Sequence, residues 1–177
     1  MMEISQRVSP KLSQTSNNIF LNEKLLARVK SIYDKKEQLN LSTEDAKLLE
    51  DLYESFKANG ATLNKDDKEK YRKLSMDLSM LTLQFDQNAL KDKNRFELLI
   101  TDENELSGLP ESARDAAAML AKSKDKDGWL FNLSAPSYIP FMRYSDKRDL
   151  REKMYREYMS VGNKGDEFDN KDIIKKI

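Results

Sequence analysis

Apolar side chains recur at three- and four-residue intervals through the first half of the chain, and this spacing predicts amphipathic helices. Residues 1–18 are mostly polar and only weakly periodic, so the first helix is expected after Asn22, which can cap it. A second helix is expected to follow Ser42 and to end at Asn59-Gly60, and a long third helix to open at Asn64. The third helix should pack nearly antiparallel on another helix along a seam formed by Tyr71, Leu74, Leu78, Leu81 and Phe85.

The pattern changes after Asn94. Residues 96–100 and 129–133 read as short strands, and a helix between them starts at Leu109-Pro110. Pro136 and Pro140 predict an extended segment through residues 134–142. A further helix, capped by Ser145 or Asp146, should end near Gly162, and the isoleucines at 173, 174 and 177 open another.

The predicted fold class is therefore mainly α, an array of amphipathic helices with a small β element at about 96–100 and 129–133. The direction in which the two strands pair does not follow from the sequence. The β-containing section is expected to span about residues 96–144.

Composition excludes several kinds of chemistry. Among 177 residues there are 31 basic and 31 acidic side chains, so the formal net charge is zero and nothing indicates nucleic acid as a partner. The basic stretches, such as Lys147–Arg151, are interleaved with acidic residues and read as solvated helix faces. The sequence contains neither His nor Cys, which excludes disulfides, thiol nucleophiles, imidazole bases and zinc sites built on these ligands. No apolar run is long enough to span a membrane.

One candidate site is a calcium loop around Asp125, Asp127 and Gly128. If Gly128 takes the sixth position of such a loop, the first and twelfth positions fall on Ser123 and Ser134. The twelfth position requires a bidentate Glu, so a turn between a helix and a strand is the better interpretation.

A second candidate is the acidic segment with Asp166, Glu167, Asp169 and Asp172, which could hold a hard cation or supply an acid and a base. Lysines lie among these carboxylates, so helix capping is favoured.

A third candidate is a pocket lined by aromatic residues, although such spacing more often packs strands on helices. These residues are Trp129, Phe131, Tyr138, Phe141 and Tyr144.

Five segments, in this order from about residue 17 onward, carry a family resemblance: NEKLLARVKSIYD, FKANGATLNKDDKEKYRKLSMDLSMLTLQFDQN, FELLITDENELSGLPESARDAAA, GWLFNLSAPSYIPFMRYSDKRDLREKMYREY and GNKGDEFDNKDIIKKI. Together they resemble the thimet-oligopeptidase-like zinc peptidases, and most nearly the bacterial peptidyl-dipeptidases. The compact loop at 162–170 is more similar to the peptidyl-dipeptidase branch than to the oligopeptidase A branch.

The resemblance implies a zinc hydrolase of two mainly helical lobes that encloses a channel and releases C-terminal dipeptides from short peptides. In that family an H-E-x-x-H helix supplies two zinc ligands and the general base. Without His, residues 1–177 cannot contain that helix, so no catalytic, cofactor-binding or metal-binding residue is carried over.

We therefore expect residues 1–177 to be part of one N-terminal helical region of a larger peptidase, a scaffold and channel wall for a C-terminal catalytic half. The parent enzyme would use zinc and act on short peptides, whereas this segment would bind no metal and be inactive. The N-terminus carries no export signal, so a cytoplasmic location is expected, although the lack of Cys suits a periplasm too. Two alternatives remain open: a stand-alone helical module that binds a protein or peptide without catalysis, and a truncated relative that retains peptide binding.

Overall fold

The computed structural model describes residues 2–177, which form two compact units. The first contains the chain as far as Leu83, together with Ile177, and the second spans Gln84–Lys176. One long helix, α4 (Lys65–Arg95), contributes residues to both units.

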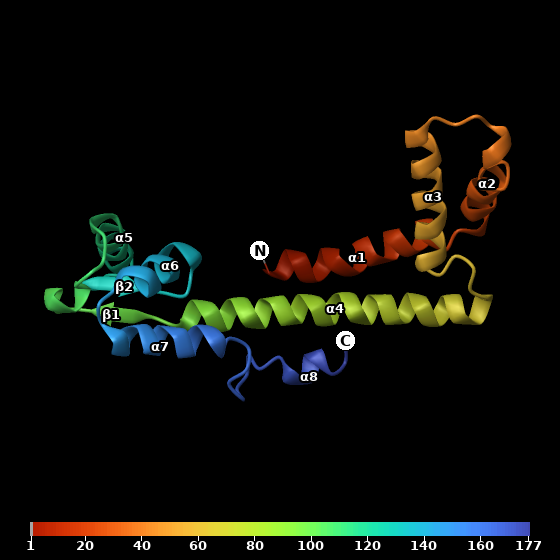
Figure 1. Cartoon of the computed structure of the whole chain (residues 1–177). Coiled ribbons are helices and arrows are strands. Elements are labelled where there is room, and N and C mark those ends of the chain that lie inside the picture. Colours follow the sequence, from red (N-terminus) through yellow and green to blue (C-terminus); the bar gives the residue numbers. More distant parts are fainter. Residues whose placement is uncertain (1) are drawn as a thin grey trace. The chain divides into compact units, whose positions relative to one another are not determined.

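The first unit is entirely helical. It contains α1 (Met2–Phe20), α2 (Glu23–Tyr33), the short 3-10 helix η1 (Lys36–Gln38), α3 (Thr43–Ala58) and the first part of α4. Helices α2 and α3 lie side by side as an antiparallel pair (Figure 1). Tyr33 and Tyr53 stack across this pair with ring centroids 4.1 Å apart. A small core forms where α1 and α3 end, from Leu21, Phe56 and Ala61.

The predicted ends of these helices are confirmed. The Asn22 side chain accepts hydrogen bonds from the amides of Lys24 and Leu25, and Ser42 accepts one from Asp45. Asn64 likewise accepts from the Asp67 amide, 2.9 Å away, at the start of α4. Gly60 has φ of +82° just after α3, a conformation that favours glycine.

The N-terminal segment differs from the prediction, because Met2–Phe20 already form a helix, α1, before α2. This helix includes Pro10, which removes one backbone donor. Its apolar residues are largely exposed, so their weak periodicity gave no sign of a buried face. Its last turn is held instead by polar contacts with α4: the Asn17 side-chain amide donates to Ser75 Oγ at 2.7 Å, and Arg72 donates to Asn18.

The seam predicted on α4 is wrong at its centre. Leu74 is 67% exposed and Leu78 is 44% exposed, so the first unit leaves much of these two side chains uncovered, whereas Tyr71, Leu81 and Phe85 are partly buried. Helical periodicity shows which face of α4 is apolar, but it does not show what covers that face.

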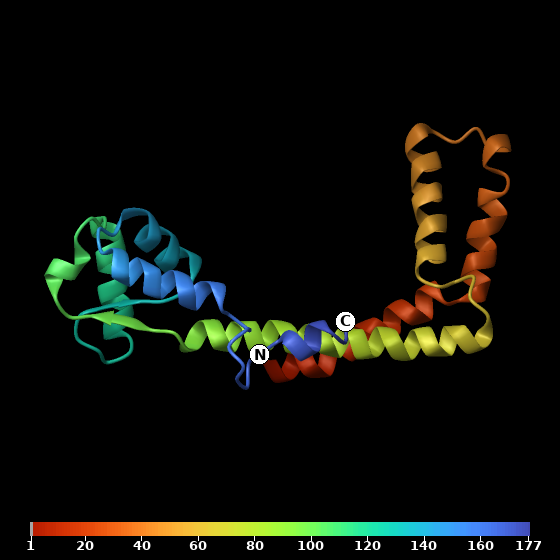
Figure 2. The same cartoon turned by 60° about the horizontal axis from the view of Figure 1, so that its bottom comes forward.

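The second unit contains the small sheet. Strands β1 (Leu98–Ile100) and β2 (Trp129–Phe131) are antiparallel, with Leu98 opposite Phe131 and Ile100 opposite Trp129 (Figure 2). Between them lie the 3-10 helix η2 (Glu103–Leu106) and α5 (Glu111–Lys122), and after them come α6 (Ala135–Tyr144), α7 (Arg148–Met159) and α8 (Lys171–Ile174). The predicted mainly α fold with a two-stranded β element is confirmed, and the strands are shorter than expected.

The core of the second unit lies where α5 packs on β2 and α6 packs on α5 and α7. Phe131 and Phe141 are fully buried and meet edge to face, with ring centroids 4.7 Å apart. Leu106, Leu133 and Met154 are also fully buried. Gly128 precedes β2 with φ of +111°, and a Cβ there would lie 2.3 Å from the Ile100 carbonyl oxygen. Only glycine therefore lets β2 approach β1 so closely.

The extended segment predicted over 134–142 is wrong, because residues 135–144 form α6. Pro136 lies in the first turn, where a backbone amide has no helical partner. Pro140 lies farther inside and removes one helical hydrogen bond. The complete burial of Phe141 offsets that loss, and burial of this kind does not follow from local sequence.

Two other predicted helix starts differ slightly. Pro110 is the N-cap of α5 and not its first helical residue. Helix α7 begins at Arg148 after Lys147, and neither predicted cap bonds its first-turn amides. Instead Ser145 Oγ accepts from the Lys147 amide, and Asp146 accepts from the Ser107 hydroxyl.

Candidate functional site

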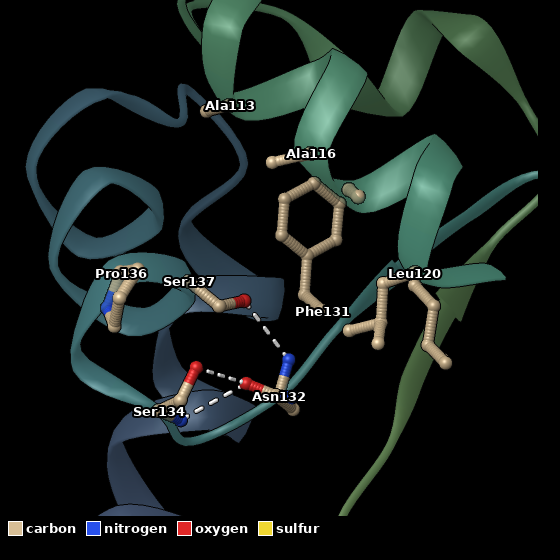
Figure 3. Close-up of a pocket in the computed structure, with 10 residues that line it drawn as sticks. Ala113, Ala116, Leu120, Phe131, Asn132, Ser134, Pro136 and Ser137 are labelled. Carbon is tan, nitrogen blue, oxygen red and sulfur yellow. Dashed lines mark hydrogen bonds between the residues drawn. The ribbon is translucent and has the colours of Figure 1, made fainter. Parts of the chain in front are cut away.

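The best-formed cavity of the second unit lies between α5, the end of β2 and the start of α6 (Figure 3). Its volume is about 210 Å³, below the range of roughly 300–1,000 Å³ that is usual for small-molecule sites. The α5 wall consists of Ala113, Ala116, Ala117 and Leu120, and the ring of Phe131 faces these alanines. The cavity is therefore suited to a single apolar group.

The polar rim of this cavity belongs to a local turn. The Asn132 amide donates to Ser137 Oγ at 3.0 Å, and the amide and hydroxyl of Ser134 donate to Asn132 Oδ1 at 3.0 and 2.6 Å (Figure 3). These bonds turn the chain from β2 into α6. Among the described residues that line the cavity there is no charged side chain, and its polar groups are those of Asn132, Ser134 and Ser137.

The aromatic residues named from the sequence mainly pack the fold, and this interpretation is confirmed. Phe131 and Phe141 are core residues, and only Phe131 lines the cavity. Tyr138 stacks on Tyr158 with centroids 4.3 Å apart, and its partial burial raises the pKa of the Tyr138 hydroxyl. Tyr144 is largely exposed.

The turn interpretation of residues 123–128 is also confirmed. Asp125 adopts a left-handed conformation with φ of +54°, and Gly128 another with positive φ, so the chain reverses direction between α5 and β2. The carboxylates of Asp125 and Asp127 take part in no hydrogen bond or ion pair with another described residue.

Carboxylates of the acidic segment bond backbone amides or basic side chains, and the bond from the Lys171 amide to Asp169 at the start of α8 agrees with the preference for capping. Asp169 accepts from the amides of Gly165 and Lys171, and these bonds lower the pKa of its carboxyl. Asp166 pairs with Arg95 and accepts from the Phe168 amide, which likewise lowers its pKa. Asp172 pairs with Lys175. Within residues 2–177, no three acidic side chains gather closely enough to share a metal ion.

Sequence reasoning missed the most deeply buried charge. Asp92, near the end of α4, has no exposed surface, and its carboxylate accepts from three donors. The Gly162 amide lies 2.8 Å away, an Arg95 guanidinium nitrogen 2.9 Å away and the Lys164 ammonium 3.1 Å away. This carboxylate thereby joins α4 to the loop that follows α7. The charged residues near Asp92 in the sequence did not indicate that it would be buried, because its partners Gly162 and Lys164 lie about seventy positions further along the chain.

Lys164 completes this network by pairing with Glu157 at 2.7 Å. Partial burial alone would lower the pKa of Lys164, but the bonds to Glu157 and Asp92 outweigh it and raise the pKa. Because each of these groups has an opposite charge beside it, the cluster stabilises the fold and leaves no reactive base or nucleophile.

A second charge cluster lies beside the sheet. Glu97, just before β1, pairs with both Lys124 and Lys126 in the turn that precedes β2. Hydrogen bonds from these two lysines hold the pKa of Glu97 below its usual value of 4.5.

None of the helices within residues 2–177 is both long and apolar enough to cross a membrane.

Comparison with curated proteins gives matches along the whole chain, whereas no model of a protein family matches. Oligopeptidase A of Salmonella typhimurium is 33% identical over all of this chain and 27% of its own length. A probable cytosolic oligopeptidase A of Arabidopsis thaliana is 37% identical over 84% of this chain and 22% of its own length. Dipeptidyl carboxypeptidase of Escherichia coli is 30% identical over all of this chain and 26% of its own length. The chain thus spans about a quarter of the length of these relatives.

The two groups of relatives differ little in their similarity to this chain. Identity is slightly higher with the oligopeptidases A of S. typhimurium and A. thaliana than with the dipeptidyl carboxypeptidase of E. coli. The alignment with that dipeptidyl carboxypeptidase, at 178 residues, is nearer the 177 of this chain than the 181 with the S. typhimurium enzyme. Fewer insertions are therefore needed in the dipeptidyl carboxypeptidase alignment.

Replacement of Asp92 by Asn should destabilise the second unit by about 2 to 3 kcal/mol, because the charge that pairs with Arg95 and Lys164 is lost. Trp129, the single Trp, lies in this unit, so its fluorescence during urea unfolding measures the effect. Asp127→Asn, an exposed replacement of the same kind, should change little. Equal effects of the two variants would contradict a stabilising role for Asp92.

The ion pairs of Glu97 should make stability depend on pH. Folding lowers the pKa of Glu97, so its ion pairs stabilise the folded chain fully above the pKa that Glu97 has in the unfolded chain. This stabilisation is lost as the pH falls through the pKa of Glu97 in the folded chain. Glu97→Gln should therefore lower the melting temperature at neutral pH, and the difference from the native chain should shrink in acid. Glu103→Gln serves as the control, and a difference that is constant with pH would contradict the assignment.

Proposed function

The chain belongs along its whole length to the family of oligopeptidase A and dipeptidyl carboxypeptidase, and we propose that it is the scaffold segment of a zinc-dependent peptidase that acts on short peptides. The observation that carries this proposal is the similarity over every part of the chain, combined with the lack of His in its sequence. One relative is named a cytosolic enzyme, and we infer a cytosolic location for this peptidase too.

The residues present do not fit a catalytic zinc ion. Catalytic zinc in proteins is held by His, Cys and carboxylate ligands, with three protein ligands as the usual number. The sequence contains no His and no Cys, and no three acidic side chains within residues 2–177 gather at one point. In the proposed enzyme, the zinc ion and the groups that act on the peptide bond therefore belong to polypeptide other than these 177 residues.

The scaffold role is supported by apolar surface that the first unit leaves uncovered. Leu74 and Leu78 lie one turn apart on the same face of α4, and they are 67% and 44% exposed. Exposed apolar faces of this kind mark surfaces that contact other polypeptide. We infer that this face of α4 packs against the catalytic part of the enzyme and forms part of the wall of its substrate channel.

The finer activity that we propose is the release of dipeptides from the C-terminus of the substrate. The compact loop at 162–170 supports it, because this loop resembles that of the peptidyl-dipeptidases, and Asp92 and Asp169 hold it through the amides of Gly162 and Gly165.

The peptidase proposal is tested with two polypeptides: the 177-residue chain, and a longer product of the same reading frame that includes an H-E-x-x-H segment. Both are incubated with N-acetylated tetrapeptides, the products are identified by mass spectrometry, and bound zinc is measured. We expect hydrolysis, zinc and inhibition by a chelator only for the longer polypeptide, with a free dipeptide as product. Chelator-sensitive hydrolysis by the short chain would overturn the scaffold role, and a reading frame that stops after Ile177 would favour a stand-alone binding module.

Leu74→Glu tests the inferred packing of α4. In the 177-residue chain this exposed position should tolerate the change, and the melting temperature should stay the same. In the longer polypeptide the same change should lower both stability and activity, because a charge would be buried in an apolar interface. Met119→Glu, on the exposed face of α5, is the control. If Leu74→Glu has no effect in the longer polypeptide, this face does not pack there.

A further inference from the structure

Three arginines of α7 surround one open hollow of the second unit. Arg148, Arg151 and Arg156 line it together with Glu152 and Tyr155 of the same helix and Met142 of α6. The volume of the hollow is about 420 Å³. The sequence alone suggested a solvated helix face for the basic residues around Lys147–Arg151. The structure adds an apolar side wall from another helix, which gives the charged face a defined shape.

The positive charge of this hollow is only partly balanced. Arg156 pairs with Glu152 at 2.6 Å, and Arg151 donates to the backbone carbonyl of Ser145. Arg148 makes no hydrogen bond or ion pair with another described residue. The hollow thus holds three guanidinium groups but only one carboxylate, that of Glu152, which is already paired with Arg156. The other charged side chains of this segment, among them Lys147, Asp149 and Lys153, do not line the hollow.

The chemistry of the hollow matches a carboxylate that is attached to an organic chain. The planar guanidinium fork binds carboxylates with two parallel hydrogen bonds. Met142 and the half-exposed ring of Tyr155 offer apolar contact beside the charges, which an inorganic anion would not use. The volume also exceeds what one small anion needs, and the hollow is open, so a peptide can cross it.

We propose that this hollow, formed by Met142 and the α7 residues Arg148, Arg151, Glu152, Tyr155 and Arg156, is a docking site for an acidic peptide segment. An Asp or Glu side chain of the peptide binds between Arg148 and Arg151, and a neighbouring apolar side chain contacts Met142 and Tyr155. The charge complementarity of the hollow selects this partner. The site takes no part in hydrolysis, and its existence does not depend on the peptidase proposal.

The test is a titration of the 15N-labelled 177-residue chain with acetyl-Leu-Glu-Leu-Glu-amide at low ionic strength, followed by NMR. Amide shifts should concentrate on α7 and around Met142, and added salt should weaken binding. Arg148→Gln should weaken binding about tenfold or more, because a charge-assisted hydrogen bond is lost. Lys153→Gln removes the same charge from the same helix outside the hollow, and should change affinity less than twofold.

Two further binding measurements distinguish a specific site from general attraction between opposite charges. The matched peptide acetyl-Leu-Gln-Leu-Gln-amide should not bind, and inorganic phosphate at the same ionic strength should not displace the acidic peptide. Equal weakening by Arg148→Gln and Lys153→Gln would overturn the proposal, as would binding of the Gln peptide or displacement by phosphate. The melting temperatures of both variants are measured, and we expect them to match that of the native chain, so that a loss of affinity reports on the hollow itself.

Discussion

The second unit depends on one buried carboxylate. Asp92 lies in the last turn of a long helix and has no exposed surface, and such a charge is tolerated only when opposite charges and amides surround it. The Gly162 amide, Arg95 and Lys164 meet that requirement, and in doing so they fix the chain after α7 against α4. Asn170 strengthens the same junction, because its side chain donates to the Phe85 carbonyl and accepts from Asn88. The loop between α7 and α8 is compact as a consequence.

The polar groups of the described residues are used mainly to hold the fold, which is consistent with the scaffold role that we propose. Among the described residues, the buried charges of Lys68 and Asp92 are paired, the carboxylates of Asp166 and Asp169 bond amides or basic side chains, and the apolar cavity is lined by no charged group. Chemistry at a peptide bond needs groups that are poised and incompletely satisfied. The described residues instead use their polar groups to fix helix ends and loops. What they leave uncovered is apolar surface on α4 and positive charge on α7, which are features of surfaces that contact other molecules.

Much of the first unit followed from local pattern, because its caps act over three residues and its helices are amphipathic. Asn22, Ser42 and Asn64 bond amides in their own first turns, so sequence is sufficient to find them. The predictions from the sequence failed where a contact between residues far apart in the chain outweighed a local preference. Pro140 stays in a helix because Phe141 is buried against Phe131, and α1 is anchored by contacts between Asn17 and Ser75.

By itself the sequence determined the fold class, the family and the absence of imidazole and thiolate ligands, since these depend on composition, periodicity and an ordered set of local matches. Only the tertiary structure decided that the strands are antiparallel, that Asp92 meets Lys164, that Leu74 and Leu78 of α4 remain exposed and that Met142 joins three arginines around one hollow. The physical reason is the same in each case. Pairing, burial and the sharing of a charge are properties of residues far apart along the chain, and local pattern carries no information about which of them meet.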